Sequence, residues 1–278
     1  MCTEELNDVI KRIDGYEENI ISSKYDEYEK FFMHFPIIVA APIDFSFPVF
    51  RVRPVEDNVD ESSPSSFSYK PQKLIPAMSR LNLKGESVFY SSIYPQTAIK
   101  ERGIKPNKEF YMSKWIINKR DLTLYRLFNH EELTSNEKAS AIINYVDSVR
   151  NDDTTKLLSL ISEKLTSTIN EANKYNFTAL YASYVRRNRI FYKLKDEEGN
   201  KRNVSIDGFL YKSIKSDNPN ELNIALFPDI IDNWGILDSV YKCSVNESFD
   251  IIIGYKGVYD GTEIKWNNSK FHYRLERP

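Results

Sequence analysis

Strand-like segments lie on both sides of one long helical block, and this arrangement limits the folds open to the chain. Residues 131–189 carry apolar side chains at helical spacing, in three separate stripes. Segments rich in β-branched and aromatic residues come before and after it, at 49–53, 87–91, 110–117, 122–128, 206–211, 222–227 and 239–275. We therefore predict an α+β fold, in which helices pack around a sheet core and a helical insertion at about 131–175 interrupts it.

The amino-terminal part has a helical pattern of its own. Apolar residues recur at helical spacing from Leu6 to Tyr16, with acidic residues on the other face, and Gly15 is expected to divide residues 4–33 into two helices. The chain has 278 residues, more than most single domains and fewer than two comfortable ones. We predict a helical extension at 1–35 and one domain at 36–278.

Charge and cysteine content exclude several classes of protein. The 38 basic and 40 acidic residues give a net charge of −2, so composition does not favour binding to nucleic-acid phosphates. Only Cys2 and Cys243 are present, which is typical of a reducing compartment, and we expect a cytoplasmic protein. The acidic first residues argue against a signal peptide.

Membrane and metal sites have no support in the sequence. The most apolar stretch, residues 31–50, is interrupted by prolines and an aspartate, so we expect no membrane span. The three histidines, His34, His130 and His272, lie far apart, and no spacing typical of zinc ligands occurs. We therefore expect no metal.

Four short pieces combine charged or polar residues with strands and glycine turns. They are residues 50–53, 79–85, 88–101 and 207–213, the last followed by the strand-like segment 222–227. Arg80 precedes a glycine turn. Tyr90 lies ten positions after Arg80, at the end of a predicted strand. Pro95 then begins a predicted helix, because proline suits a first helical turn, and this helix carries Glu101 eleven positions after Tyr90.

In their order and spacing, these pieces resemble the RES domain family, named for its arginine, glutamate and serine. The resemblance spans about residues 48–228, and its matching positions are Arg80, Asn82, Gly85, Tyr90, Ala98, Glu101, Asp207, Gly208, Tyr211 and Ser213. It implies an ADP-ribosyltransferase-like fold, with a split antiparallel sheet and NAD bound in a cleft between two small sheets. RES proteins are typically toxins of bacterial toxin–antitoxin pairs that degrade NAD, and some relatives modify a protein target.

The resemblance implies an enzyme that consumes NAD, its substrate, by cleaving the nicotinamide–ribose bond. Water, phosphate, protein or nucleic acid could accept the ADP-ribosyl group, so a hydrolase or phosphorylase, an ADP-ribosyltransferase, and a non-catalytic NAD-binding module all stay open. The implied partner is an antitoxin protein. The extension and the insertion depart from the short members of the family, and the stripes of the insertion could pack on the core or on a second subunit.

The chemistry of NAD cleavage suggests a role for each matched residue. The transition state resembles a ribosyl oxocarbenium ion, so a carboxylate such as Glu101 would stabilise its positive charge. Arg80 can grip the pyrophosphate through paired, charge-assisted hydrogen bonds. Tyr90 offers a flat face for the nicotinamide ring, and Ser213 offers a small donor to its amide or to the ribose.

Further residues complete the predicted NAD site. Arg51 and Arg53 could supply a second grip on the pyrophosphate, and Asn82 and Ser91 are assigned to NAD binding. Taken alone, each of these side chains is more often part of the fold, and their joint pattern is what favours the functional interpretation. The polar segment 55–71 is predicted to be a long surface loop that acts as a lid or a target-docking element.

Overall fold

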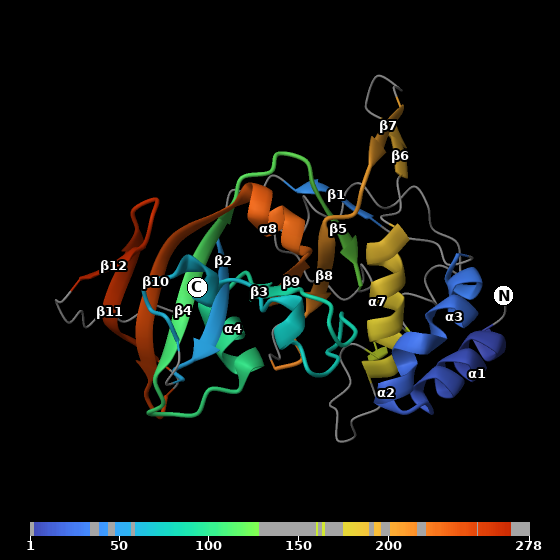
Figure 1. The fold of residues 1–278 in the computed structure, drawn as a ribbon, viewed down its shortest axis with the longest axis horizontal. Coiled ribbons are helices and arrows are strands. Elements are labelled where there is room, and N and C mark those ends of the chain that lie inside the picture. The colour runs from blue at the N-terminus through green and yellow to red at the C-terminus, as the bar shows by residue number, and fades with distance from the viewer. Residues whose placement is uncertain are drawn as a thin grey trace.

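The computed structural model describes residues 3–33, 39–43, 48–56, 59–127, 160, 163–164, 175–188, 192–195, 201–215, 221–248 and 250–267. It is a mixed α/β structure with one large sheet and several helices (Figure 1). Most of the insertion predicted at 131–175 lies outside the described residues. None of the helices that the structure describes combines the length and the apolar composition that a membrane span requires.

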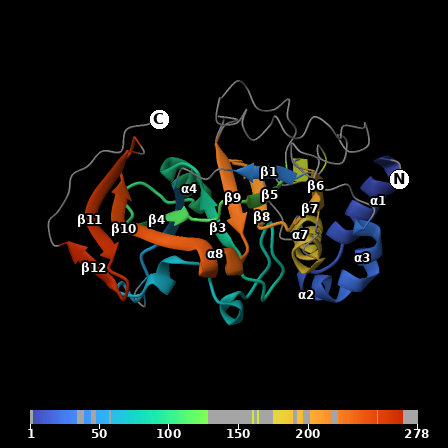
Figure 2. The same ribbon diagram turned by 90° about the horizontal axis from the view of Figure 1, so that it is seen from above.

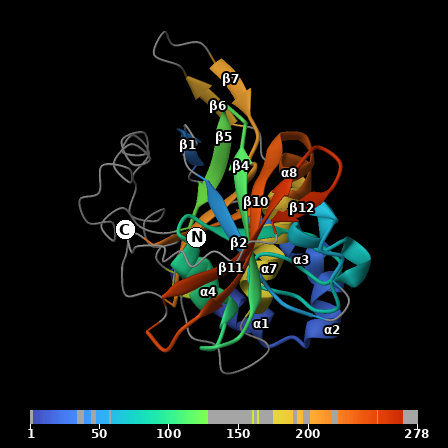
Figure 3. The ribbon, with the colours of Figure 1, turned by 90° about the vertical axis from the view of Figure 1, so that its left-hand side faces the viewer.

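Ten strands form the large sheet, in the order β1-β5-β8-β9-β3-β2-β4-β10-β11-β12. Their bounds are β1 Val39–Ile43, β2 Val49–Pro54, β3 Phe89–Ser92, β4 Phe110–Ile117, β5 Leu122–Arg126, β8 Gly208–Lys212, β9 Leu222–Leu226, β10 Gly235–Val245, β11 Ile251–Tyr259 and β12 Ile264–Asn267. A separate hairpin of β6 (Tyr192–Lys195) and β7 (Lys201–Val204) projects from the body of the molecule (Figures 1 and 3).

The sheet consists of two five-stranded halves. They meet between β2 and β3, where the register contains the single pair Phe50 and Ser92. All neighbouring strands are antiparallel except β5 and β8, which are parallel. Hydrogen bonds connect all ten strands, so the split sheet expected from the resemblance is not confirmed. The resemblance also implied an antiparallel sheet, and the parallel pair of β5 and β8 corrects that expectation.

Six α-helices accompany this sheet in the described part of the chain. They are α1 Thr3–Asp14, α2 Glu18–Ile21, α3 Tyr25–Phe32, α4 Pro95–Arg102, α7 Asn176–Asn188 and α8 Pro228–Trp234. Short 3-10 turns occur at Ser22–Lys24, Pro64–Phe67 and Gln72–Leu74. Helix α7 lies between the amino-terminal helices and strands β5 and β8 (Figures 1 and 2), and Phe32 of α3 packs its ring against Phe177 and Tyr181 of α7.

Two glycines show how local sequence places the site. Helix α4 begins with Pro95 at its first turn and ends at Gly103, whose φ of 68° closes the helix in the left-handed conformation that glycine adopts freely. At Gly208, a Cβ atom would lie 2.2 Å from the carbonyl oxygen of Ala225. Only glycine therefore allows β8 to approach β9 this closely.

The polar segment 55–71 is fastened to the sheet where the structure describes it, at 55–56 and 59–71. Phe67 is buried against Tyr111, and Ser113 donates to the Phe67 carbonyl oxygen at 3.2 Å. The indole of Trp266 donates to the Glu61 carbonyl oxygen at 2.9 Å. The prediction of a surface lid rested on the polar residues of the segment. It missed Phe67, which is buried in the core, and Tyr69, which packs against the core and donates its hydroxyl to Asp232 at 2.8 Å.

Candidate active site

One face of the sheet carries a group of polar and aromatic side chains between helices α4 and α7. Tyr90 and Ser92 of β3 lie opposite Ala225 and Asn223 of β9, and Asn223 lies opposite Tyr211 of β8. Directly paired residues project from the same face of a sheet, so these side chains share one surface. Both helices pack on it. Helix α4 packs through the cluster around Val52, next to the Phe50–Ser92 pair. Helix α7 packs through Tyr181, whose ring meets the Tyr125 ring edge to face, and Tyr125 in turn contacts the Phe209 ring.

Glu101, in the last turn of α4, is held by three hydrogen-bond donors. Its Oε1 accepts from the Ser213 hydroxyl at 2.6 Å, the Asn223 side-chain amide at 2.8 Å and the Ile214 backbone N–H at 3.3 Å. Its other oxygen, Oε2, has no hydrogen-bond partner within the described part of the chain. The structure thus brings together Glu101 and Ser213, which lie 112 positions apart, and leaves one carboxylate oxygen available.

A second layer of hydrogen bonds supports these donors. The Ser92 hydroxyl donates to Asn223 Oδ1 at 2.5 Å, which leaves the amide nitrogen of Asn223 to face Glu101. Asn223 and Ser92 are 1% and 2% exposed, so their polar groups need these partners. The hydroxyl hydrogen of Ser213 is committed to Glu101, and its oxygen accepts the Lys215 N–H at 3.2 Å.

Arg80 lies in the turn before the glycine, and its guanidinium is incompletely paired. Its Nη1 is buried and has no hydrogen-bond partner among the described residues. Its Cζ lies 5.5 Å from the centre of the Tyr175 ring, at the start of α7. A buried guanidinium N–H without an acceptor costs about 1–3 kcal/mol, so an anion that supplied an acceptor would bind here favourably.

Tyr90 connects this turn to the sheet. Its hydroxyl donates to Asn82 Oδ1 at 2.9 Å and accepts the Leu81 N–H at 3.0 Å. Burial raises the pKa of Tyr90, and the pKa of Tyr211 is also well above its usual value, first through burial and then through the neighbouring Tyr90 and Glu101. Asn82 is buried, and its side-chain amide accepts from the Tyr90 hydroxyl and donates to the Leu83 carbonyl oxygen. These two hydrogen bonds stabilise the turn that contains Arg80.

The remaining predicted NAD ligands have partners elsewhere. Ser91 alternates with Tyr90 and Ser92 along β3, so it projects from the other face, where it donates to the Ile224 carbonyl at 3.1 Å. Arg51 donates to the carbonyl oxygens of Ser68 and Tyr90 at 3.0 and 2.9 Å, and burial, then Arg102 and Arg53, lowers its pKa to about 10. Their contact with NAD stays a prediction.

Arg53 is engaged in the same way as Arg51. It donates to the Ser66 carbonyl oxygen at 2.7 Å and forms an ion pair with Glu56 at 3.3 Å. Both arginines alternate with Val52, which packs beside α4, and so they emerge on the opposite face of β2. In this structure they fasten the segment that contains Phe67.

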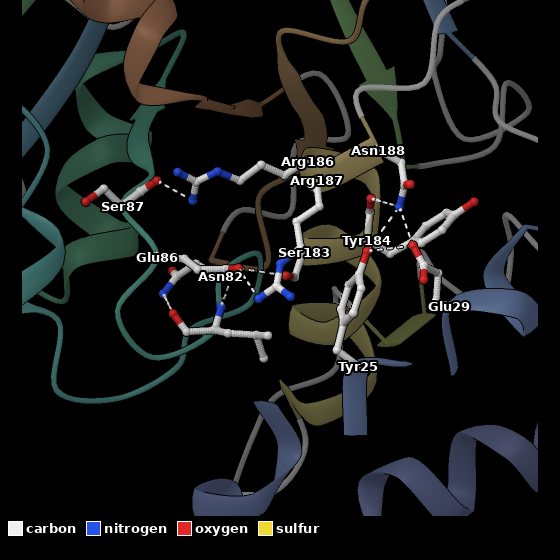
Figure 4. A network of polar contacts seen from close by, with 11 residues as sticks. Tyr25, Glu29, Asn82, Glu86, Ser87, Ser183, Tyr184, Arg186, Arg187 and Asn188 are labelled. Carbon is white, nitrogen blue, oxygen red and sulfur yellow. Dashed lines mark hydrogen bonds and ion pairs between the residues drawn. The ribbon is translucent and has the colours of Figure 1, made fainter. Parts of the chain in front are cut away.

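Helix α7 also forms hydrogen bonds with Glu86 and Ser87, which follow the Arg80 turn (Figure 4). Ser183 donates to Glu86 Oε1 at 2.6 Å, and Arg187 contacts the same oxygen at 3.2 Å. Arg186 donates to the Ser87 carbonyl oxygen at 3.0 Å. Glu86 Oε2 in turn accepts the Leu83 N–H at 3.0 Å, so the turn between Arg80 and Tyr90 is held from the helix side.

Three residues of this site were not predicted from the sequence. Asn223 is an amide within the otherwise apolar strand Leu222–Leu226, and a polar residue in a buried strand was the available signal. Tyr211 belongs to the matched pattern but was given no role. Tyr175 has no sequence signal, because only the fold brings it to Arg80. Among the described residues, no group of three or more His, Cys, Asp or Glu side chains could hold a metal ion.

The comparisons with known proteins give one match to a family and one to a solved structure. The model of a family described as "RES domain" matches residues 48–237. A chain in the crystal structure of the M. tuberculosis MbcT–MbcA toxin–antitoxin complex is similar with a TM-score of 0.38 and 10% sequence identity, over 74% of this chain and 88% of that chain. No curated protein matches the sequence.

Proposed function

Because the chain belongs to the RES domain family, we propose that it binds NAD and cleaves the nicotinamide–ribose bond. The observation that carries the proposal is the state of the two charged groups. Glu101 is held by three donors with Oε2 left over, and Arg80 has a buried Nη1 without a partner among the described residues. A fixed carboxylate and an anion-seeking guanidinium, both close enough to Tyr211 to act on its pKa, suit a substrate with a cationic ribose and a pyrophosphate.

In the proposed mechanism, Arg80 binds the pyrophosphate and Glu101 Oε2 faces the ribose. As the nicotinamide leaves, positive charge develops on the ribose, and the carboxylate stabilises it. Because nicotinamide in NAD is already a cationic leaving group, its departure needs no general acid. The three donors keep Glu101 from turning away, which is the preorganisation that makes electrostatic stabilisation effective.

Two further side chains have a role in the proposed site, Tyr90 and Ser213. Tyr90 keeps its hydroxyl bonded to the Arg80 turn, and its ring face is proposed to stack on nicotinamide. Ser213 acts in this proposal by positioning Glu101, since its hydroxyl hydrogen is already used. The chemistry of NAD cleavage suggested that Ser213 donates to the nicotinamide amide or to the ribose, and a direct contact through its oxygen stays a prediction.

Incubation of the purified full chain with NAD, followed by chromatography, tests the proposed reaction. We expect steady release of nicotinamide and ADP-ribose in water, and a phosphorylated ADP-ribose in phosphate buffer would identify a phosphorylase. Slow release that accelerates when cell lysate is added, with label transferred to a protein or nucleic acid, would replace hydrolysis by transfer. NAD that binds and is never cleaved would leave a binding module.

We further propose that the chain is the toxin of a toxin–antitoxin pair. A toxin that consumes NAD should lower the cellular NAD level and stop growth when it is expressed, and the Glu101→Gln variant should do neither. Co-expression with the protein encoded next to it should restore growth if that protein is the antitoxin. Growth arrest that persists in the Glu101→Gln variant would contradict an NAD-based toxicity.

A further inference from the structure

The amino-terminal helices contact the Arg80 turn directly. Glu18 of α2 accepts the Met78 N–H through Oε1 at 2.8 Å. Met78 is buried and lies two positions before Arg80, next to the Ser79–Asn82 bridge that closes the turn. A side chain far away in sequence therefore fixes the backbone from which Arg80 projects.

The same helices also hold the start of α7. The N–H of Phe177 donates to Asp14 Oδ1 at 3.2 Å, which satisfies an unpaired amide of the first helical turn. The side chain of Asn176 donates to the carbonyl oxygens of Ile13 and Tyr16 at 3.2 and 2.7 Å. Tyr175, the residue just before them, carries the ring against which Arg80 lies.

These contacts come from outside the segment that the family model matches. Residues 48–237 match, whereas Asp14 and Glu18 precede them. The far end of α7 is tied to the same extension: the Arg187 guanidinium lies 4.2 Å from the Tyr25 ring centre, and Asn188 donates to the Tyr25 hydroxyl at 3.0 Å (Figure 4). The extension thus supports both sides of Arg80, the turn and the tyrosine.

We propose that the amino-terminal helices position Arg80 for NAD, Glu18 through the 78–82 turn and Asp14 through Tyr175. This inference rests on the proposed function. Arg80 has a buried N–H without an acceptor among the described residues, so its own hydrogen bonds do not fully fix it and its neighbours must. Glu18 and Asp14 are positioning residues, and their loss weakens NAD binding while the Glu101 carboxylate keeps its three donors.

The first test separates KM from kcat. Glu18→Ala should raise the KM for NAD about fivefold, as expected for one lost hydrogen bond, with kcat within twofold of the wild type. Asp14→Ala should raise the KM at least as much, because it removes both the bond to the Phe177 N–H and the ion pair of Asp14 Oδ2 with Lys164 at 2.6 Å. Glu18→Gln keeps an oxygen acceptor for Met78 and should restore the KM to within twofold. Glu17→Ala and Asp8→Ala, which change exposed acidic residues of the same extension, should leave both constants unchanged.

The second test does not depend on NAD. Hydrogen exchange of the amides from Met78 to Asn82 should become faster in Glu18→Ala and stay unchanged in Glu17→Ala and Glu18→Gln. Unchanged exchange and unchanged KM in Glu18→Ala, with a wild type that consumes NAD, would overturn the positioning role. A lower melting temperature and a lower kcat at constant KM would overturn it too, since that is general loss of folded protein. A wild type that neither binds nor cleaves NAD would instead refute the proposed function, and faster exchange would then still establish that Glu18 holds the turn.

Discussion

The Glu101 region and the Arg80 region differ in how completely their polar groups are satisfied. One oxygen of Glu101 accepts three hydrogen bonds, all from residues 213–223 within the family-matched segment. Arg80 keeps a buried N–H with no acceptor among the described residues, and its turn is held partly by the extension outside that segment. A group that stabilises a transition state must be rigid before the substrate arrives, whereas a group that binds an anion must keep a donor free.

The largest effect should follow from removing the charge of the satisfied group. Glu101→Gln keeps the shape of the side chain and loses the charge that stabilises the ribosyl cation. We expect NAD turnover to fall about 10²-fold or more, with little change in the dissociation constant of NAD. Glu109→Gln, at an exposed position, is the matched control. Wild-type turnover in the Glu101→Gln protein would remove the catalytic role from this region.

The next effect concerns the unsatisfied group and should appear in binding. Arg80→Lys keeps one positive charge and loses the fork of donors, so the dissociation constant of NAD should rise roughly ten- to thirtyfold. Calorimetric titration in the Glu101→Gln background measures this without consuming the ligand. Arg120→Lys, an exposed arginine, should bind NAD as before. An unchanged dissociation constant in Arg80→Lys would show that Arg80 does not bind the pyrophosphate, and the proposed difference between the two regions would be wrong.

A smaller effect tests whether Ser213 acts through Glu101. Ser213→Ala removes one of the three donors to Oε1, and kcat should fall about fivefold. In the Glu101→Gln background the same change should cost much less, because the charge that it orients is gone. Equal losses in both backgrounds would indicate that Ser213 contacts the substrate itself, as the chemistry of NAD cleavage suggested.

The smallest effect is expected on the other face of the sheet. Arg53 is bonded to the Ser66 carbonyl and to Glu56, so Arg53→Lys should change the dissociation constant of NAD less than twofold. Calorimetric titration of the Arg53→Lys and Arg80→Lys proteins with NAD compares the two dissociation constants directly. If the two variants weaken NAD binding equally, the binding region extends through the sheet to the residues that the sequence suggested as a second grip.

Much of the fold could be predicted because periodicity marks its elements. The strand expected at 110–117 is β4 with the same bounds, the helix opened by Pro95 is α4, and the break at Gly15 follows α1. The order of the strands in the sheet was not predictable, because the pairing of strands depends on contacts between residues far apart in the sequence. The parallel β5–β8 pair brings Leu124 beside Gly208 across most of the helical block.

The candidate site shows the same limit. The resemblance identified Arg80, Tyr90, Glu101 and Ser213, and the family match confirms the family, although their roles stay proposals. Side-chain alternation explains why Arg51 and Ser91 were included: both are polar residues in matched strands, and sequence alone does not say which face a residue occupies. Tyr175 and Glu18 were missed because their partners are distant residues of an extension and an α7 start that no local pattern connects to Arg80.

The distances along the chain between these partners have a consequence for synthesis. Glu101 emerges from the ribosome 122 positions before Asn223, its last partner. At roughly 5–20 residues per second, this delay is on the order of 6–24 s. During that interval the carboxylate lacks the donors that orient it, so a nascent chain or a fragment that stops before Asn223 should be harmless to the NAD pool of the cell that makes it.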